Sequence, residues 1–474
     1  MEHKRTSFSG SFGFVLAAAG SAVGLGNLWR FPYLAAKDGG GLFLVVYLAL
    51  ALTFGFALLT AEIAIGRKTK QGPLTAYNRI HKSWFSKMIG VFACVVPFLI
   101  LPYYCSIGGW ITKYLVTFVT GHGEEAAGDE FFGGFITGNV QPIIFTIIFL
   151  AAIMFVIYKG VKKGIEFSSK IIMPILIILV VGISIFALTI SYTDASGVTK
   201  TGLDGLKILL IPNFEGITFS KFITVVVDAM GQLFFSLSIA MGIMIAYGSY
   251  VSDDSNLIRS INHIEIFDTV VAFLAGTMII PAVYVFMGTE GMSAGPSLMF
   301  VSLPKVFAAM GKAGGVIGAL FFAMVLFAAI TSAMSILEAI VSSLIDKFKW
   351  SRKKATLIEG TIAGVLGIIV CLGYNLFYFE MPLPTGSTGQ ILDLLDYISN
   401  SVLMPIVSIS TCILIGWIVG PKIVIDETTK NGEKIHRKKL FVIMIKFIAP
   451  ILLLFLFLNS TGIFTQIENL ILGK

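Results

Sequence analysis

Charge is scarce in this chain. Charged residues make up only 13% of its 474 residues, about half their share in an average soluble domain, whereas 56% of the residues are hydrophobic. Apolar runs of roughly 20 residues, the length needed to cross about 30 Å of hydrocarbon, recur from Phe12 to Leu458. These runs leave no room for a sizeable soluble domain. The composition therefore excludes a soluble enzyme and predicts a polytopic membrane protein.

Features of several catalytic classes are also absent. The sequence contains no Gly-x-x-x-x-Gly-Lys-Ser/Thr phosphate loop, so ATP hydrolysis by this chain is disfavoured. Its 5 histidines lie in loops or near the ends of spans without forming a metal-ligand cluster. The cysteines all fall inside apolar runs, which argues against a disulfide framework and against redox chemistry; they are Cys94, Cys105, Cys371 and Cys412. We expect that the protein is not an enzyme.

Hydropathy, together with Gly, Pro and charged residues between the runs, predicts eleven transmembrane helices. They lie at about 12–35, 41–66, 88–118, 141–158, 166–190, 220–249, 264–287, 313–345, 356–376, 391–420 and 439–458. We expect an all-α polytopic membrane protein, with residues 1–474 forming a single transmembrane domain. Two inverted five-helix repeats would cover about 12–190 and 220–420, with helix 11 at about 439–458. The halves share no demonstrable identity, so the repeat rests on corresponding interruptions in spans 1 and 6.

The basic residues between the spans predict the orientation in the membrane. With a cytoplasmic N-terminus, the inside segments carry 24 Lys and Arg residues and the outside segments carry 7. The positive-inside rule therefore places the N-terminus in the cytoplasm and the C-terminus outside. This distribution also accounts for the formal net charge of +7, so the lipid bilayer is the expected surrounding and no nucleic-acid partner is expected.

Spans 1 and 6 contain residues that an ordinary anchor helix would not tolerate. In span 1, Gly24 and Gly26 precede Asn27, although any single glycine is explained by close approach of a neighbouring helix. Span 6 carries an amide and hydroxyls at mid-membrane, followed by Gly242. Unwound backbone at this depth is tolerable only where it lines a protein-enclosed or watery cavity. Free carbonyls there suit a desolvated cation, and the N-terminus of the next half-helix suits a carboxylate.

A known family has this arrangement of residues. The run from Gly20 to Pro32, Gly-Ser-Ala-Val-Gly-Leu-Gly-Asn-Leu-Trp-Arg-Phe-Pro, resembles the first-span signature of the neurotransmitter:sodium symporter family, which has the leucine-transporter fold. The resemblance continues through Gly39-Gly-Gly41, Tyr103-Tyr104, Gln232 to Gly242, Thr331-Ser332 and Asp393-Leu-Leu-Asp396. It covers nearly the whole chain and is strongest to the eleven-span bacterial members that carry hydrophobic or aromatic amino acids. The long outer loop of animal members is absent, which points to a bacterial inner membrane.

The resemblance implies two sodium ions bound beside the substrate. The first would take the carbonyl of Ala22 and the side chains of Asn27, Ser236 and Asp268. The second would take the carbonyls of Gly20, Val23 and Ala328 and the hydroxyls of Thr331 and Ser332. Oxygen ligands suit a hard cation, although a hydroxyl such as that of Thr331 can also bond back to its own helix.

The same resemblance implies that chloride is not required. Animal relatives have a neutral asparagine at the position of Asp268 and bind chloride nearby. Here the carboxylate of Asp268 can supply that negative charge, and Ala272 replaces a hydroxyl of the chloride site. We expect two sodium ions and no chloride.

Carried over in the same way, the family's substrate pocket indicates an L-amino acid. The pocket would consist of Ala22, Gly24, Leu25, Gly26, Ile100, Tyr104, Phe235, Ser236, Ser238, Met241, Ser332 and Ile336. Monoamine carriers place an aspartate at the position of Gly24, whereas glycine leaves space and half-helix amides for a carboxylate, assisted by Tyr104. Met241 stands where several relatives have phenylalanine, and its flexible thioether suits a large hydrophobic or aromatic side chain.

Two rival functions remain open. A non-transporting amino-acid sensor on the same fold would bind sodium and substrate without accumulating the substrate. A channel would lack saturable counterflow. The exact amino acid, the oligomeric state and any counter-transport of protons are not determined by the sequence.

Gating residues are also implied by the resemblance. Arg30 and Asp396 would close the extracellular side, beneath which Phe235 and Tyr104 would form an aromatic lid. The cytoplasmic side would be closed by Arg5, Asp346 and Tyr250, although Arg5 and Asp346 taken alone are better explained as ordinary loop and interface charges.

Two further features concern sodium release and the acids within the spans. Gly164 and Pro174 have the spacing found in relatives, and the resemblance implies that the cytoplasmic half of span 5 unwinds and releases the second sodium ion; an ordinary proline kink is the alternative. Glu62 matches a family position on span 2, and the resemblance implies that it is a buried hydrogen-bonding partner for the broken span 6. Glu338, an acid inside span 8, has no assigned role.

Overall fold

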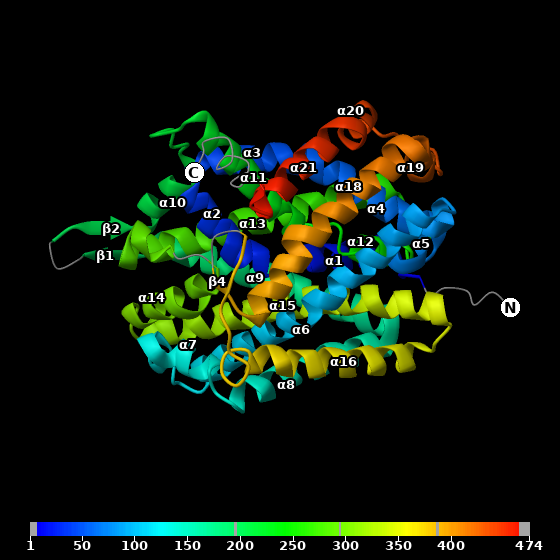
Figure 1. Ribbon diagram of the computed structural model, residues 1–474. Coiled ribbons are helices and arrows are strands. Elements are labelled where there is room, and N and C mark those ends of the chain that lie inside the picture. The colour runs from blue at the N-terminus through cyan, green and yellow to red at the C-terminus, as the bar shows by residue number, and fades with distance from the viewer. Residues whose placement is uncertain (1–6, 194–196, 293–294, 385–387, 464–474) are drawn as a thin grey trace, which may run out of the picture.

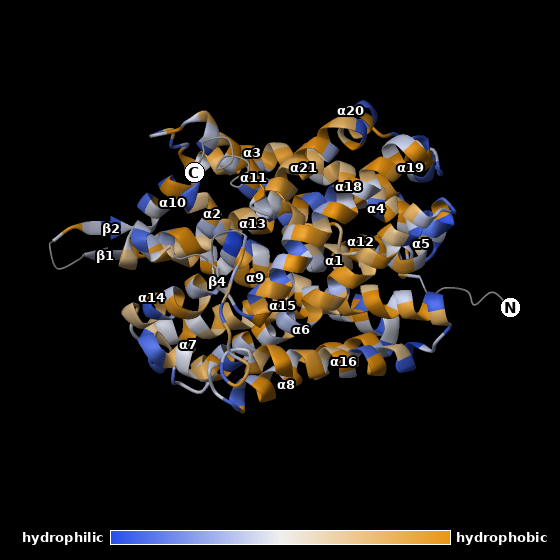
Figure 2. Ribbon diagram, viewed as in Figure 1, coloured by the Kyte–Doolittle hydropathy of each residue, from blue (hydrophilic) through white to orange (hydrophobic). Residues whose placement is uncertain are grey.

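Long apolar helices lie side by side in the computed structural model of the chain, which describes residues 7–193, 197–292, 295–384 and 388–463 (Figure 1). The short helices α7, α10 and α14 and the hairpin β1–β2 gather at one end of these helices, and α5 and α19 gather at the other. The outward-facing helices α8 and α16 are hydrophobic along most of their length, and hydrophilic residues collect toward their ends (Figure 2). Exposed side chains such as Phe155 and Ile178, 61% and 70% accessible, therefore face the position of the lipid.

The helices of the first half have the following bounds. They are α1 (Ser11–Ala22), α2 (Phe31–Lys37), α3 (Gly41–Leu50), α4 (Phe56–Thr69), α5 (Pro73–Ile80), α6 (Trp84–Val119), α7 (Asp129–Ile136), α8 (Gln141–Gly160) and α9 (Phe167–Thr189). Segments of π-helix occupy Gly26–Arg30, Ala51–Gly55 and Val161–Glu166, and a 3-10 turn occupies Glu125–Ala127.

The second half continues with α10 (Gly202–Leu210), α11 (Phe219–Ser236), α12 (Ile243–Gly248), α13 (Leu257–Met287), α14 (Leu303–Ala309), α15 (Lys312–Phe348) and α16 (Arg352–Leu372). The last helices are α17 (Ile391–Asp396), α18 (Met404–Ile413), α19 (Lys422–Thr428), α20 (Lys438–Ile443) and α21 (Ala449–Ser460). Segments of π-helix occupy Leu298–Ser302, Tyr397–Leu403, Leu414–Ile418 and Met444–Ile448, and a 3-10 turn occupies Thr289–Gly291. In the interior, α6 packs along α15 and α8, and α13 packs along α9 and α1.

Two small hairpins depart from the all-α expectation. β1 (Ser191–Thr193) pairs antiparallel with β2 (Thr199–Thr201), with Tyr192 opposite Lys200. β3 (Met381–Pro382) pairs with β4 (Thr388–Gly389). Hydropathy does not predict these strands because they belong to connections between the apolar runs.

The helices agree with a polytopic membrane protein. Among the described residues, nine helices are long and apolar enough to cross a membrane, or ten when a bent pair counts as one span. One of the nine is the 49-residue run Gln141–Thr189. As a straight helix this run would measure about 74 Å, more than twice the hydrocarbon thickness. Gly160 in the run has a φ of +87°, outside the α-helical region, and α8 ends there. The number of eleven spans and the inverted repeat stay predictions.

Span 1 is broken where the sequence predicts. α1 ends at Ala22, Val23 leaves the helical region with a ψ of 89°, and the chain becomes helical again from Gly26. The two half-helices, Ser11–Ala22 and Gly26–Lys37, are bent by 50° relative to each other. The break exposes backbone groups of residues 23–25 to the interior of the protein rather than to lipid, since these residues are buried.

Span 6 is broken by a strained turn. α11 ends at Ser236 and α12 begins at Ile243, and between them Ser238, Ala240 and Gly242 have positive φ values of 53°, 65° and 69°. Serine and alanine rarely adopt this left-handed conformation, so the surrounding structure must hold it in place.

Glu338, which the sequence left without a role, is paired. Arg352 at the start of α16 donates from Nη1 to Oε2 of Glu338 at 2.5 Å and from Nη2 to Oε1 at 2.9 Å. The hydroxyl of Tyr250 donates to the same Oε1 at 2.5 Å. Because an unpaired charge inside the protein would be strongly destabilising, the partners explain why α15 tolerates this acid.

The carboxyl group of Asp38 is also buried, at the place where α2 meets α11. Asp38, between α2 and α3, is 4% accessible. The ammonium of Lys37 lies 2.7 Å from Asp228 in α11 and 3.9 Å from Asp38, so two carboxyl groups share one cation. Oδ2 of Asp38 is buried and has no hydrogen-bond partner among the described residues. Burial and the neighbouring carboxylate of Asp228 raise the pKa of Asp38 to about 7.

This raised pKa makes the stability of the fold depend on pH. The ordinary pKa of an aspartate is about 3.9, so the folded protein binds more protons than the unfolded chain between about pH 4 and pH 7. Stability should therefore fall as pH rises through this window. We expect the thermal midpoint in detergent to drop by about 2 °C between pH 5.5 and pH 8, and Asp38→Asn to remove most of this drop. Glu290→Gln, which removes an exposed carboxylate, is the control; an equal pH dependence in Asp38→Asn and Glu290→Gln would contradict the assignment.

Candidate functional site

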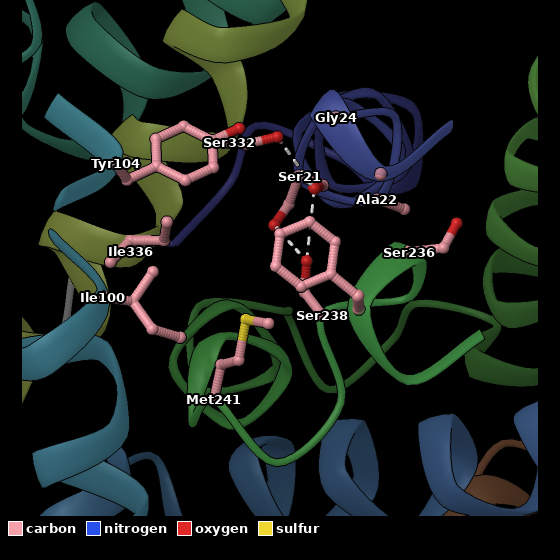
Figure 3. A pocket seen from close by; sticks show the side chains of 12 residues that line it. Ser21, Ala22, Gly24, Ile100, Tyr104, Ser236, Ser238, Met241, Ser332 and Ile336 are labelled. Atoms are coloured by element: carbon pink, nitrogen blue, oxygen red, sulfur yellow. Dashed lines mark hydrogen bonds between the residues drawn. The ribbon is translucent and has the colours of Figure 1, made fainter. Parts of the chain in front are cut away.

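A cavity with about 320 Å³ of empty space lies between the two helix breaks, α6 and α15 (Figure 3). It is lined by Ser21, Ala22, Gly24, Gly26, Ile100, Tyr104, Phe235, Ser236, Ser238, Met241, Ser332 and Ile336. The structure thus brings together eleven of the twelve residues expected at the substrate site. Leu25, the twelfth, is fully buried and is not among the residues that line the cavity.

Ser21 is the lining residue that the sequence analysis missed. It lies in the last turn of α1, immediately before the break, and is 3% accessible. A hydroxyl directly before the unwound stretch was the available signal, but the sequence alone does not show which way it points.

The cavity has an apolar side and a polar side. Ile100, Ile336 and Met241 lie together on one side, and the hydroxyls of Tyr104 and Ser332 lie next to each other on another (Figure 3). This division suits a ligand that has both a large apolar group and polar or charged groups.

The polar side lies against the broken backbone of span 1. The hydroxyl of Tyr104 is buried and has no hydrogen-bond partner among the described residues. A Cβ atom at Gly24 would lie 2.7 Å from Oγ of Ser332 and 3.6 Å from Oη of Tyr104. A side chain at this position would therefore have to displace the hydroxyl of Ser332, and the tyrosine hydroxyl lies beside the unwound chain. A buried donor without a partner is destabilising unless a ligand accepts its hydrogen bond.

The side chains expected at the first sodium site form one buried cluster. Asn27 donates from Nδ2 to Oδ1 of Asp268 at 2.9 Å. Ser236 donates to Oδ1 of Asn27 at 2.9 Å and lies 2.5 Å from Oδ1 of Asp268. Tyr47, which the sequence analysis did not include, donates to Oδ2 of Asp268 at 3.1 Å. One carboxylate surrounded by amide and hydroxyl oxygens is a donor set that fits a hard cation of low charge.

The residues expected at the second sodium site lie where α1 meets α15. A Cβ atom at Gly20 would lie 3.3 Å from Cβ of Thr331, so the backbone of α1 approaches α15 closely there. Thr331 donates its hydroxyl to the carbonyl of Ala328 at 3.0 Å, the local bond that the sequence analysis kept as an alternative. This bond uses the proton and leaves oxygen lone pairs available. The carbonyl of Val23 belongs to the break that follows α1.

These donor sets differ from a transition-metal site. In the part of the chain that the structure describes, no group of three or more His, Cys, Asp and Glu side chains could hold a metal ion. The oxygens come instead from amides, hydroxyls and backbone carbonyls with a single carboxylate, which favours a monovalent or other hard cation over zinc or copper.

Glu62 holds the break of span 6, as the sequence analysis expected. Its Oε1 accepts the backbone N–H of Ala240 at 2.7 Å, in the middle of the strained turn. Glu62 is 1% accessible, so no water supplies an alternative partner for this amide.

The expected extracellular gate is only partly assembled. Asp396 accepts hydrogen bonds from the hydroxyl of Tyr103 at 3.0 Å and from Nδ2 of Asn400 at 2.5 Å. Among the ion pairs of the described residues, none joins Arg30 directly to Asp396. Phe235 and Tyr104, the expected aromatic lid, both line the cavity.

One of the three residues expected at the cytoplasmic gate, Arg5, lies outside the described residues. Asp346 accepts the backbone N–H of Gly72 at 2.6 Å, and Tyr250 bonds to Glu338. The structure therefore places Asp346 beside the start of α5 and Tyr250 beside α15.

The residues expected to control sodium release lie on either side of the start of α9. Gly164 lies in the π-helical segment before α9, and Pro174 lies inside α9. A Cβ atom at Gly164 would lie 2.0 Å from the carbonyl oxygen of Val156. Close packing therefore requires glycine at 164 in this conformation, whatever the segment does during a transport cycle.

Known proteins resemble this chain over nearly its whole length. The model of the sodium:neurotransmitter symporter family matches residues 5–124 and 136–469. An uncharacterised sodium-dependent transporter of Bacillus subtilis, YhdH, is 34% identical over 98% of this chain and 99% of its own length. An uncharacterised sodium-dependent transporter of Methanocaldococcus jannaschii is 32% identical over 98% of this chain and 92% of its own length.

A solved structure supports the same relation at the level of the fold. The chain matches the crystal structure of MhsT in complex with L-phenylalanine with a TM-score of 0.83 and 35% identity. The match covers 96% of this chain and 100% of the MhsT chain.

The contact between Glu62 and Ala240 generates a prediction about stability. Glu62→Ala removes the acceptor and leaves a buried amide unsatisfied, which should destabilise the protein by about 1 to 3 kcal/mol. The thermal midpoint should fall, and amide exchange at residues 237–242 should become faster. Thr60→Ala is the matched control, because the buried hydroxyl of Thr60 in the same helix has no partner among the described residues. Equal effects of the two substitutions would show that Glu62 does not support the turn.

Proposed function

Because the chain belongs to the sodium:neurotransmitter symporter family, we propose that it carries an L-amino acid across a membrane together with sodium, by alternating access. Its relatives are transporters, and the chain is not an enzyme. We base the choice of substrate on the buried hydroxyl of Tyr104. This hydroxyl lies beside the unwound backbone at Gly24 and has no hydrogen-bond partner among the described residues.

The polar side of the cavity suits the α-carboxylate. The half-helix that starts at Gly26 has no side-chain cap at its N-terminus, and a helix N-terminus favours negative charge. The O–H of Tyr104 supplies one more donor. An aspartate at position 24, as monoamine carriers have, would have to displace Ser332, because even a Cβ atom lies 2.7 Å from its oxygen. An amino acid therefore fits better than a monoamine.

The apolar side of the cavity suits a large hydrophobic or aromatic side chain. Ile100, Ile336 and Met241 are all buried and present only carbon and sulfur atoms to a ligand. A thioether adapts its shape to a flat ring more easily than a β-branched side chain does. The bound L-phenylalanine of MhsT, a protein similar to this chain, agrees with this class of substrate.

Sodium would be the coupled ion, at two sites. The cluster of Asn27, Ser236 and Asp268 adjoins the cavity through Ser236, so one ion would sit next to the substrate. The second would lie between α1 and α15, at Thr331 and Ser332. Two sodium ions entering down a tenfold gradient and about 100 mV release about 7 kcal/mol, which suffices for roughly 10⁵-fold accumulation of a zwitterion.

We place the protein in a bacterial inner membrane with eleven spans. Separating α8 from α9 at Gly160 and counting each broken helix as one span gives this number. The N-terminus would be cytoplasmic and the C-terminus outside, as the distribution of basic residues requires. The two five-helix repeats would be inverted relative to each other, with the breaks of spans 1 and 6 at equivalent positions.

Gating and release complete the proposed cycle. Arg30 and Asp396 would close the outer side, and Arg5, Asp346 and Tyr250 the inner side. Gly164 and Pro174 would let the first turns of α9 unwind, because a proline cannot supply the hydrogen bond that would hold its turn. Water could then reach the second sodium site.

Uptake into proteoliposomes tests the proposal. We expect an inward sodium gradient to drive accumulation of radiolabelled aromatic and large aliphatic amino acids, with a preference found by competition among the twenty. Asn27→Ala should lower uptake at limiting sodium by tenfold or more, because it removes a ligand from a dehydrated ion. Thr361→Ala, which removes an exposed hydroxyl that donates to the carbonyl of Leu357 in its own helix, should not change uptake. Sodium-dependent binding without accumulation would instead support the sensor.

Chloride independence can be tested in the same vesicles. Replacing chloride with gluconate should leave uptake unchanged, because Asp268 supplies the negative charge beside the first sodium ion. Asp268→Asn should reduce uptake by tenfold or more and should raise the sodium concentration needed for half-maximal rate. A strong requirement for chloride in the parent protein would refute this assignment of Asp268.

A further inference from the structure

Two carboxyl groups and one ammonium group meet where the half-helix Gly26–Lys37 approaches α11, away from the cavity. Nζ of Lys37 lies 2.7 Å from Oδ2 of Asp228 and 3.9 Å from Oδ1 of Asp38. Asp38 is 4% accessible, and its Oδ2 has no hydrogen-bond partner among the described residues. Asp228 lies within hydrogen-bonding reach of Asp38 once one of the two carries a proton. The arrangement therefore lacks one group that would join the two carboxyl groups.

A proton is the ligand that fits between these carboxyl groups. Two carboxylates in contact cannot both stay ionised, and the single charge of Lys37 offsets only one of them. With a proton on Asp38, its O–H can donate to Asp228. A divalent cation fits poorly, because it would have to bind beside the ammonium group, which repels it. Burial and the carboxylate of Asp228 raise the pKa of Asp38 to about 7, so such a proton is held close to neutral pH.

Other charged groups around Asp38 do not take the place of this proton. Lys221, in the first turn of α11, acts on Asp38 in the opposite direction to Asp228, but its side chain is exposed. The neighbouring helix α3 has no charged residue, and in α10 Asp204 and Lys207 pair with each other at 2.8 Å. The charged residues of α13 lie in its first half, at 259–268, and Arg30 lies beside Gly231 of α11.

The same two half-helices meet again at the cavity. Gln232 of α11 donates to the carbonyl of Gly26 at 3.0 Å, and Ser236 donates to Oδ1 of Asn27 at 2.9 Å. Asp228 precedes Ser236 by eight residues, about 12 Å along α11, which lies beside α2 (Figure 1). The first sodium site takes Asn27 from one half-helix and Ser236 from the other in the proposed function. Separation of the half-helices would therefore pull this site apart.

We propose that Asp38 and Asp228 form a proton-binding site that joins the half-helix Gly26–Lys37 to α11 and thereby supports binding of sodium and substrate. This inference rests on the proposed function for its effect on substrate. Loss of the proton leaves two carboxylates facing each other, and their repulsion favours separation of the half-helices. Coupling of this kind is reciprocal: if the proton favours the joined half-helices, a ligand that joins them raises the affinity for the proton.

The pH dependence of binding tests the coupling in the full-length protein. Sodium-dependent binding of radiolabelled L-phenylalanine should weaken by about fivefold or more between pH 5.5 and pH 8, the lower end of ordinary coupling between sites. Asp38→Asn should bind equally well at both pH values, because its amide can donate to Asp228 without a titrating proton. Asp228→Asn should do the same, since its amide can donate to an ionised Asp38.

The control for these variants is Glu290→Gln, which removes an exposed carboxylate and should keep the pH dependence of the parent. A parent whose affinity does not change with pH would overturn the coupling, as would an unchanged pH dependence in Asp38→Asn. Binding that magnesium strengthens at constant pH in the parent and not in Asp38→Asn would overturn the assignment of the ligand as a proton.

Infrared difference spectra test the proton site without any substrate. Raising the pH from 5.5 to 8 should remove the carbonyl stretch of one protonated carboxyl group from the parent, and this change should be missing from Asp38→Asn. Equal difference spectra of the two proteins would overturn the site. A parent protein that binds none of the twenty amino acids at either pH would overturn the proposed function, whereas the infrared difference would still decide whether Asp38 and Asp228 hold a proton.

Discussion

The structure depends on one constraint: backbone groups freed by a helix break cannot be left unsatisfied in hydrocarbon. Two spans nevertheless unwind in the middle of this protein, after Ala22 and after Ser236. The breaks are possible because both are enclosed by other helices, so that protein side chains replace the missing water. Glu62 accepts the N–H of Ala240, and Gln232 donates to the carbonyl of Gly26 at 3.0 Å. The cavity exists because these two breaks face each other.

The same constraint accounts for the ionic groups within the bundle. Arg67 is fully buried and donates from Nε to Glu427 at 2.8 Å and from Nη1 to the carbonyl of Ser255 at 2.8 Å. Glu338 is held by Arg352 and Tyr250. Partners such as these make a buried charge tolerable, because each replaces part of the hydration that was lost. Asp268, like Glu62, has only uncharged partners among the described residues: Asn27, Ser236 and Tyr47 surround its carboxyl group.

Polar groups at the cavity divide into those that are satisfied within the protein and those that are not. The serines of α1 and α15 bond to one another and to backbone carbonyls, and they therefore define the shape of the site before any ligand is bound. The hydroxyl of Tyr104 has no such partner among the described residues.

The amino-acid sequence by itself determined the apolar spans, the breaks in spans 1 and 6 and the lining of the cavity, apart from Ser21 and Leu25. These features are local or are carried by motifs: a run of apolar residues crosses a membrane wherever it occurs, and glycines beside an amide weaken a helix in any context. Only the tertiary structure decided the pairing of Glu338 with Arg352, the support of Asp268 by Tyr47 and the contacts of Ser21 with Ser238 and Ser335. These depend on which side chains from distant helices come within hydrogen-bonding distance of one another, and hydropathy and motif spacing carry no information about that distance.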